Sequence, residues 1–186
     1  MQVERFTPES SDTTHVSVMD AKGNCVTMTH SLGMPSGAIT PGLGFMYNGC
    51  MGVFDPRPGR AGSIAPGKSR FSSLCPTIVF EGAEPRIVLG APGGTQIAMG
   101  VLHALLNMID FKMPVLDAVS APRFSATSNA IDISNRIPGY LVEPLQDAGY
   151  EVIRSPSSFG FAAVHAIEKT AEGVRGGADP GQDGVA

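Results

Sequence analysis

The sequence lacks a basic run and a long apolar run, and each absence excludes one kind of partner. Only 16% of its 186 residues are charged, and the formal net charge at pH 7 is −4. The 13 Lys and Arg residues are scattered and form no basic run, so no nucleic-acid partner is expected. No apolar run approaches the length of about 18 residues that a membrane-spanning helix needs, so no membrane partner is expected either.

The three cysteines and four histidines lack the spacing of metal ligands. Cys25, Cys50 and Cys75 form no CxxC pair, and the histidines form no HExxH cluster. We therefore expect neither a metal nor a cofactor. An odd number of cysteines in apolar surroundings is typical of reduced thiols and favours a cytoplasmic location. A signal peptide on a longer precursor would instead direct the protein to the periplasm or out of the cell.

The chain has enough apolar residues to bury a core as one domain or as one subunit. Apolar runs at 75–80 and 86–90 predict two buried strands, and helical spacing over 94–109 predicts a helix after them. Residues 31–67 are rich in Gly and Pro and predict a long loop. Further short helices and strands are expected at 115–120, 138–148, 152, 161–167 and 174–178. Helices grouped between strand hairpins predict an α+β fold.

The segment from Thr13 to Thr29 reads as a β-hairpin whose first strand begins at a threonine. If the peptide bond before Thr13 is cut, that residue gains a free α-amine. An α-amine has an ordinary pKa of about 7.7–8.0, so it can act as general base for the neighbouring hydroxyl without a histidine. The alternative is that Thr13 is an ordinary β-branched strand residue.

A glycine-rich turn, Gly90-Ala91-Pro92-Gly93-Gly94-Thr95, joins the second apolar strand to the long predicted helix. Its glycines would let backbone N–H groups approach a ligand at the positive end of that helix. A phosphate loop would need a following Lys-Ser or Lys-Thr, which Thr95-Gln96 does not supply. An oxyanion hole for acyl transfer fits better, and the alternative is an ordinary tight turn.

Taken in order, these segments resemble the small subunit of the γ-glutamyltranspeptidase family. The shared blocks are T-T-H-x-S-V-x-D-x-x-G-N from residue 13, S-S-x-x-P-T-I-V from residue 72 and G-x-P-G-G from residue 90. Ala121-Pro122-Arg123-Phe124 and Ala178-Asp179-Pro180 match two further family segments. The resemblance covers essentially residues 10–186. It implies an α+β fold of the αββα sandwich type, that of the N-terminal-nucleophile hydrolases.

The resemblance also implies a role for each matching residue. Thr13 would be the nucleophile and, through its α-amine, the base, while the hydroxyl of Ser31 would support it. Gly93 and Gly94 would form the oxyanion hole through their N–H groups. The residues implied to hold the α-carboxylate of a glutamyl group are Ser72 and Ser73, which taken alone could equally be turn residues.

A division of the chain and a partner follow from the same resemblance. Residues 1–12 would be the precursor segment before the cleavage site, and residues 13–186 the small, catalytic subunit. The partner would be the large subunit of the same precursor, and the substrate a small amide such as a γ-glutamyl compound. With residues 1–12 attached and the large subunit absent, the isolated chain is expected to be inactive and to expose apolar surface.

Two positions depart from the family pattern. Gly33 stands where typical members carry an asparagine that contacts the glutamyl head group, and Val53 replaces the aspartate that grips the substrate α-ammonium. Asp55 would replace that aspartate only if the loop shifted. Without a carboxylate partner a buried ammonium group is costly, so a glutamyl substrate should bind poorly.

Three functions therefore remain open. The leading one is a γ-glutamyltranspeptidase-like amide hydrolase or acyltransferase of the glutathione hydrolase type, working through an acyl-enzyme. The first alternative is the same fold acting on a non-glutamyl amide, as in oxamate amidohydrolases and cephalosporin acylases. The second is a non-catalytic binding relative that is never cleaved before Thr13.

Overall fold

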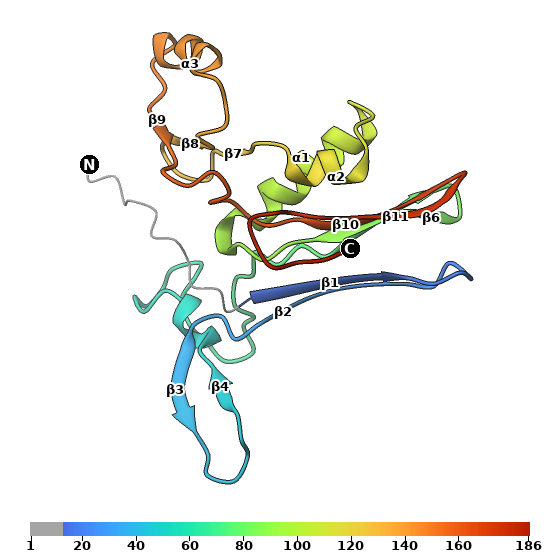
Figure 1. The fold of residues 1–186 in the computed structure, drawn as a ribbon. Coiled ribbons are helices and arrows are strands. Elements are labelled where there is room, and N and C mark those ends of the chain that lie inside the picture. The colour runs from blue at the N-terminus through green and yellow to red at the C-terminus, as the bar shows by residue number, and fades with distance from the viewer. Residues whose placement is uncertain (1–12) are drawn as a thin grey trace.

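The chain begins with a long antiparallel hairpin, β1 (Thr13–Met19) and β2 (Cys25–Ser31), in the computed structural model, which describes residues 13–186 (Figure 1). The turn between the strands is fixed by Asp20, whose carboxylate accepts hydrogen bonds from the backbone N–H groups of Lys22 and Asn24. The predicted hairpin is confirmed, and its second strand is two residues longer than predicted, ending at Ser31. The predicted segment 1–12 lies outside the described residues.

A four-stranded antiparallel sheet faces this hairpin, in the order β11-β10-β6-β5. Its strands are β5 (Thr77–Glu81), β6 (Glu84–Gly90), β10 (His165–Thr170) and β11 (Gly173–Ala178). The sequence predicts both β5 and β6 as buried on two faces, and this is correct for β6, in which residues 87–90 are all buried. It is wrong for β5, because β5 is an edge strand on which Phe80 is 58% exposed.

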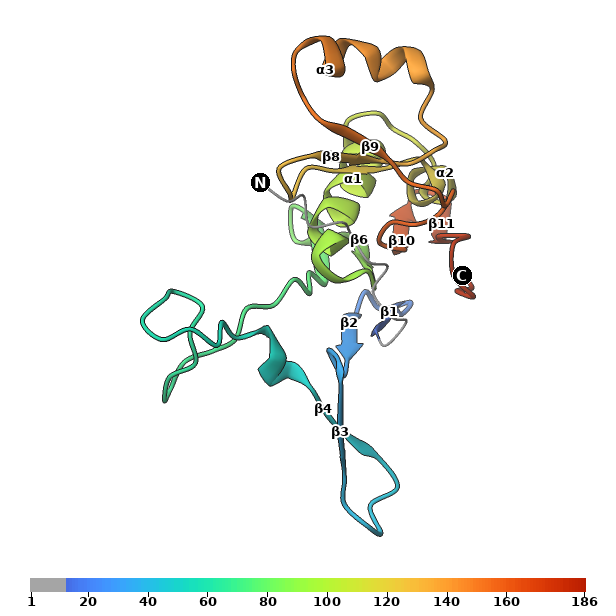
Figure 2. The same ribbon diagram turned by 90° about the vertical axis from the view of Figure 1, so that its left-hand side faces the viewer.

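Two helices cover the opposite face of the four-stranded sheet (Figures 1 and 2). The long predicted helix forms as a 3-10 turn, η2 (Gly94–Gln96), followed by α1 (Ile97–Ile109), and the next is α2 (Val115–Ser120). Apolar residues at helical spacing along α1 pack onto the sheet, and the burial of these side chains stabilises the helix. The core between them includes Ile87, Leu89, Ile97, Val101, Ala104, Met108, Val115, Val119 and Val164.

The long loop predicted over residues 31–67 is interrupted by secondary structure that the prediction missed: β3 (Pro35–Ile39), β4 (Met46–Asn48) and the 3-10 helix η1 (Cys50–Val53). Every residue of β3 is exposed, so the strand lacks the inside–outside alternation that sequence patterns detect. The β3–β4 hairpin projects away from the two sheets in both views.

A small subdomain completes the fold at the other end of the molecule. Its three-stranded sheet contains β7 (Phe124–Ser125), β8 (Ile131–Ile133) and β9 (Val152–Arg154). The helix predicted over 138–148 forms as a 3-10 turn, η3 (Gly139–Leu141), and the short helix α3 (Glu143–Asp147). Strands β7 and β8 are absent from the prediction because they are only two and three residues long.

The α+β class is confirmed, and the described residues supply three layers: the β1–β2 hairpin, the four-stranded sheet and the helices. No helix from residues 13–186 covers the outer face of the hairpin, where four apolar side chains are 43–56% exposed: Val16, Val18, Val26 and Met28. Within the same range, no helix has the length and apolar character to cross a membrane.

Candidate functional site

The first residue of β1 lies beside a serine at the end of β2. Thr13 and Ser31 are directly opposite each other in the ladder, and their hydroxyl oxygens are 2.8 Å apart. The backbone N–H of Gly33 donates to the Ser31 hydroxyl at 2.9 Å. That contact uses one acceptor position of Ser31, so its proton and a second acceptor position both remain for the contact with Thr13.

Behind this pair, the inner face of the hairpin is lined with hydroxyl groups around a buried histidine. The Nδ1 atom of His15 is 2.8 Å from the Thr29 hydroxyl, and its Nε2 atom is 3.0 Å from Ser17 and 3.2 Å from Thr27. This network is absent from the predictions made from the sequence. The sequence does carry a pattern that indicates a shared polar face, because polar residues alternate with period two on both strands, as T-x-H-x-S and T-x-T-x-S.

The network reaches across to the second sheet. The hydroxyl of Thr27 donates to the backbone carbonyl of Leu89, in β6, at 3.0 Å. The next residue, Gly90, packs against the imidazole of His15 so closely that a Cβ there would lie 2.2 Å from the ring carbon Cε1. Only glycine leaves room for the ring at this place.

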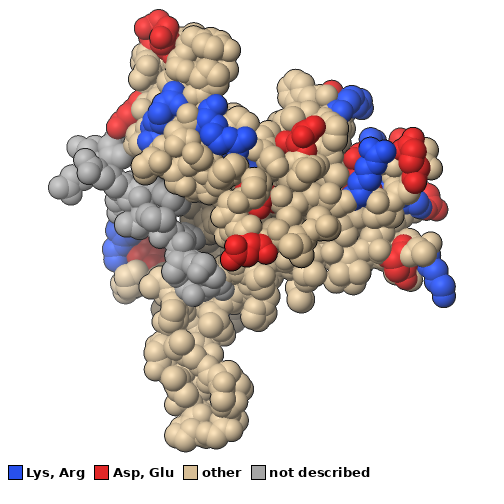
Figure 3. Space-filling view, viewed as in Figure 1, with Lys and Arg blue, Asp and Glu red and all other residues tan. Residues whose placement is uncertain are grey.

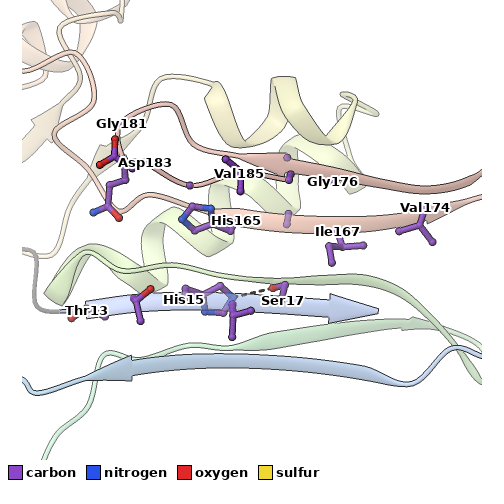
Figure 4. Close-up of a pocket in the computed structure, with 17 residues that line it drawn as sticks. Thr13, His15, Ser17, His165, Ile167, Val174, Gly176, Gly181, Asp183 and Val185 are labelled. Carbon is purple, nitrogen blue, oxygen red and sulfur yellow. Dashed lines mark hydrogen bonds between the residues drawn. The ribbon is translucent and has the colours of Figure 1, made fainter. Parts of the chain in front are cut away.

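A second histidine packs on His15 (Figure 4). The ring of His165, from β10, stacks on that of His15 with centroids 6.4 Å apart and an angle of 12° between the planes. Burial, and then the neighbouring His165, lower the pKa of His15 from 6.5 to about 4. Burial also lowers the pKa of His165, although Asp179 opposes the shift. Both rings are therefore neutral at pH 7.

The glycine-rich turn begins at Gly90, at the end of the sandwich where β1 starts. Gly93 has φ 138° and Gly94 has φ 55°, conformations that side chains disfavour. A Cβ on Gly93 would also lie 2.5 Å from the Cα of Ala162. Among residues 13–186, the N–H groups of Gly93 and Gly94 have no hydrogen-bond partner. Two adjacent free donors at the start of a helix suit an anionic oxygen.

A groove of about 990 Å³ runs along β1 between the hairpin and the C-terminal residues. Its walls are residues 13–17 of β1, parts of β10 and β11, and residues 181–186. Thr13 is the only predicted site residue that lines it. The other seven predicted site residues lie elsewhere in the described chain: Ser31, Gly33, Val53, Ser72, Ser73, Gly93 and Gly94.

The predicted carboxylate-binding serines lie in an extended stretch before β5. The Ser72 hydroxyl accepts the N–H of Leu74 at 3.3 Å, as in a turn, and its residue is exposed. Ser73 is half-buried, and its hydroxyl has no hydrogen-bond partner among residues 13–186. Both hydroxyls therefore keep a proton for a carboxylate, because the Ser72 oxygen is engaged only as an acceptor.

The two departures from the family pattern lie in different surroundings. Gly33 has φ 69°, and a Cβ there would lie 3.1 Å from the sulfur of Cys50, so a larger side chain would require Cys50 to move. Val53 ends η1 and is 44% exposed. Asp55 is already engaged, because its carboxylate accepts two hydrogen bonds from the Arg57 guanidinium at 2.8 Å. That contact lowers the pKa of Asp55 and leaves the carboxylate committed to Arg57.

The last two family segments meet in a buried ion pair. The guanidinium of Arg123 donates to the carboxylate of Asp179 at 2.5 Å, and both side chains are almost fully buried. Arg123 also donates to the backbone carbonyls of Ala162 and Val119. Gly93 packs against Ala162, so the Arg123–Asp179 ion pair holds in place a residue that supports the glycine-rich turn.

No three His, Cys, Asp or Glu side chains within residues 13–186 gather as a group that could hold a metal ion. The three cysteines are all unpaired thiols. The groups gathered around Thr13 are hydroxyls and neutral imidazoles, and free backbone donors lie in the glycine-rich turn, which are groups that suit acyl transfer through a hydroxyl nucleophile.

Comparison with known proteins gives one consistent family. The sequence profile described as gamma-glutamyltranspeptidase matches residues 2–186. The chain is 40% identical over 172 residues to the Acylase ACY 1 proenzyme of Pseudomonas sp. (strain V22), covering 91% of this chain. It is 30% identical over 194 residues to the Glutathione hydrolase proenzyme of Pseudomonas aeruginosa, covering 95% of this chain.

Solved structures agree with this relationship. The gamma-glutamyltranspeptidase T380A mutant of Helicobacter pylori superposes with a TM-score of 0.81 at 32% identity, covering 91% of this chain and 100% of that one. The fold is therefore that of this family of N-terminal-nucleophile hydrolases. The chain spans only 30% of the length of the acylase proenzyme and 34% of that of the glutathione hydrolase proenzyme.

Proposed function

Because the chain belongs to the γ-glutamyltranspeptidase family, we propose that it is the catalytic part of an amide hydrolase or acyltransferase in which Thr13 is the nucleophile. In this proposal the precursor cuts its own peptide bond between Asp12 and Thr13. Residues 13–186 then form the small subunit, and the new α-amine of Thr13 serves as the base.

The observation that carries the proposal is the pair of hydroxyls at the start of β1, 2.8 Å apart. Gly33 N–H occupies one acceptor position of Ser31, and in this proposal Ser31 donates its own proton to the Thr13 oxygen. The proton of Thr13 is then free to pass to the α-amine as the oxygen attacks. Ser31 thereby fixes the direction of the nucleophile, a role that a plain strand threonine would not need.

The reaction proceeds in two balanced steps. The Thr13 oxygen adds to the amide carbon, its proton moves to the α-amine, and the N–H groups of Gly93 and Gly94 stabilise the tetrahedral oxyanion. The C–N bond breaks, and the amine leaves with the proton held by the α-amine. Water, or an acceptor amine, then attacks the ester, and the α-amine takes its proton. The ester C–O bond breaks, the α-amine returns that proton to the Thr13 oxygen, and the acyl product is released.

The partner in this proposal is the rest of the precursor, which in relatives makes up about two thirds of the length. The region that carries the projecting β3–β4 hairpin supports such a partner. Its residues 31–54 contain no charged residue and appear as an uncharged arm in Figure 3. Large apolar side chains are exposed on and beside this arm: Met34, Ile39, Leu43, Phe45, Tyr47 and Met51. Together with the uncovered face of β1–β2, they form the surface we assign to the large subunit.

A second candidate is an acylase that acts on a non-glutamyl amide. Val53 supplies no carboxylate for a substrate α-ammonium, and Asp55 is held by Arg57. Gly33 likewise lacks the amide that typical members present to the glutamyl head group. One similar protein is named an acylase proenzyme, at 40% identity. These features favour an acyl group without an α-amine.

Two anilide substrates separate the candidates, because glutaryl-p-nitroanilide is γ-glutamyl-p-nitroanilide without its α-amino group. The full-length precursor should be expressed, allowed to mature and assayed with both, next to Thr13→Ala. Preference for the glutamyl compound supports the transpeptidase, and preference for the glutaryl compound supports the acylase. A protein that stays uncut and turns over neither compound would be the non-catalytic binding relative.

A further inference from the structure

One hydrogen bond connects the strand pair that carries Thr13 to the strand that leads into the glycine-rich turn. It runs from the Thr27 hydroxyl to the Leu89 carbonyl at 3.0 Å. Among residues 13–186 it is the only hydrogen bond between the β1–β2 hairpin and the four-stranded sheet. It is placed one residue before Gly90, on which the His15 ring rests.

The protons in this network can be assigned from its donors and acceptors. Thr27 has one hydroxyl proton and gives it to the Leu89 carbonyl, so toward His15 it can only accept. The Nε2 atom of His15 therefore carries a proton, which points at Thr27 and Ser17. In the neutral ring Nδ1 is then the acceptor and receives the proton of Thr29.

We propose that His15 and Thr27 are positioning residues that set the distance between the Thr13 nucleophile and the Gly93–Gly94 donors. This rests on the proposed function, in which those two groups act on the same carbonyl. His15 is two residues from Thr13, and Leu89 is four residues before Gly93. The His15–Thr27–Leu89 chain of hydrogen bonds thus holds both halves of the reaction centre to each other.

The proposal requires that a small shift between the sheets matters. A misplacement of about 1 Å can lower a catalysed rate by about 100-fold, because the oxyanion donors must meet the charge where it forms. The remaining contacts between hairpin and sheet are packing contacts, which permit sliding more readily than a directional hydrogen bond.

The test is a set of hydroxyl deletions in the mature full-length protein, assayed with both anilides. Thr27→Val removes the hydroxyl at constant shape, and Thr27→Ser keeps it. Thr29→Val is the matched control, since it deletes a hydroxyl from the same face of the same strand that contacts His15 but not β6. We expect Thr27→Val to lower kcat about tenfold or more with KM within about twofold, while Thr27→Ser and Thr29→Val stay within about threefold.

Equal kcat for Thr27→Val and Thr27→Ser would overturn the proposal. So would an equal loss in Thr27→Val and Thr29→Val, because it would mean a general weakening of the hairpin. If Thr27→Val fails to fold, substitutions of His15 decide. His15→Gln places an amide at the position of Nε2 and His15→Asn at that of Nδ1, so only His15→Gln should retain kcat. The reverse order, or no difference, would contradict the proposal.

Failure of the proposed function can be distinguished from failure of the positioning proposal. A parent protein that is cut before Thr13 but turns over neither anilide would contradict the function alone. The positioning claim is then tested by crystal structures of the parent and Thr27→Val. A change of about 0.5 Å or more in the distance from Thr13 Oγ1 to Gly93 N would support it. An unchanged distance would overturn it.

Discussion

The hydroxyl of Ser31 lies 2.8 Å from that of Thr13, across the ladder of the first hairpin. The pair sits where β1 begins, so cleavage before Thr13 would place a third group, the α-amine, next to both. An amine, a hydroxyl and a supporting hydroxyl would then occupy one small volume.

Ser31→Ala should lower kcat about 10- to 100-fold, because it removes a hydrogen bond to an oxygen that develops charge. Ser31→Thr keeps the hydroxyl and should retain most of the activity. The measurement is kcat per mature active site in the processed protein. Equal activity of the alanine and threonine variants would show that Ser31 does not support the nucleophile.

Gly93→Ala should lower kcat on the order of 10²–10³-fold, the usual loss for one oxyanion donor. The added Cβ would overlap Ala162 and force the backbone N–H away from its present direction. Gly82→Ala is the control, since Gly82 also has positive φ, at 63°, but no atom lies within 4 Å of its added Cβ. Parallel losses in both variants would assign the effect to backbone strain rather than to the donor.

Val53→Asp should raise the ratio of γ-glutamyl to glutaryl turnover at least about tenfold, because it restores a carboxylate partner for the α-ammonium. Val53→Asn, similar in size but uncharged, should change the ratio far less. Initial rates with the two anilides give the ratio directly. An unchanged ratio in Val53→Asp would mean that residue 53 does not face the α-position of the acyl group.

Stability should fall on acidification, because burial lowers the pKa of His15 to about 4 and also lowers that of His165. In the unfolded chain these groups have a pKa of about 6.5, so the unfolded state binds more protons below that pH. For His15 the loss begins as pH falls through about 6.5 and is complete below about 4. Asp179 faces His165 and reduces its share.

Thermal unfolding of the mature protein between pH 7.5 and pH 4 measures this dependence. His15→Gln cannot take up the proton, so it should lose less stability over the same interval than the parent protein. If the two proteins lose the same amount, His15 does not contribute to the acid sensitivity.

The sequence was informative wherever burial imposed a periodic pattern. The hairpin at Thr13, strand β6, the helix that begins near Gly94 and the α+β class were all predicted from alternation, apolar runs and helical spacing. The β3–β4 hairpin was not, because its exposed residues leave no burial pattern. Strand register and contacts between sheets could not be predicted either: no sequence pattern indicates that Thr13 pairs with Ser31, or that the Thr27 hydroxyl contacts the Leu89 carbonyl.

The candidate site was likewise only partly predictable from the sequence. Family motifs pointed to Thr13, Gly93 and Gly94, and the structure leaves the donors of both glycines free. The roles given to Ser72, Ser73 and Val53 remain predictions. His15 was read only as part of a motif, because its partners are hydroxyls from another strand and a carbonyl from another sheet. Contacts of this kind have no signature along the chain.

The central claim is that Thr13 becomes an N-terminal nucleophile, and intact mass spectrometry of the expressed full-length precursor tests it most directly. The account predicts two polypeptides, the smaller beginning at Thr13, and a single uncut chain for Thr13→Ala. An uncut wild-type precursor, or cleavage that persists in Thr13→Ala, would contradict it.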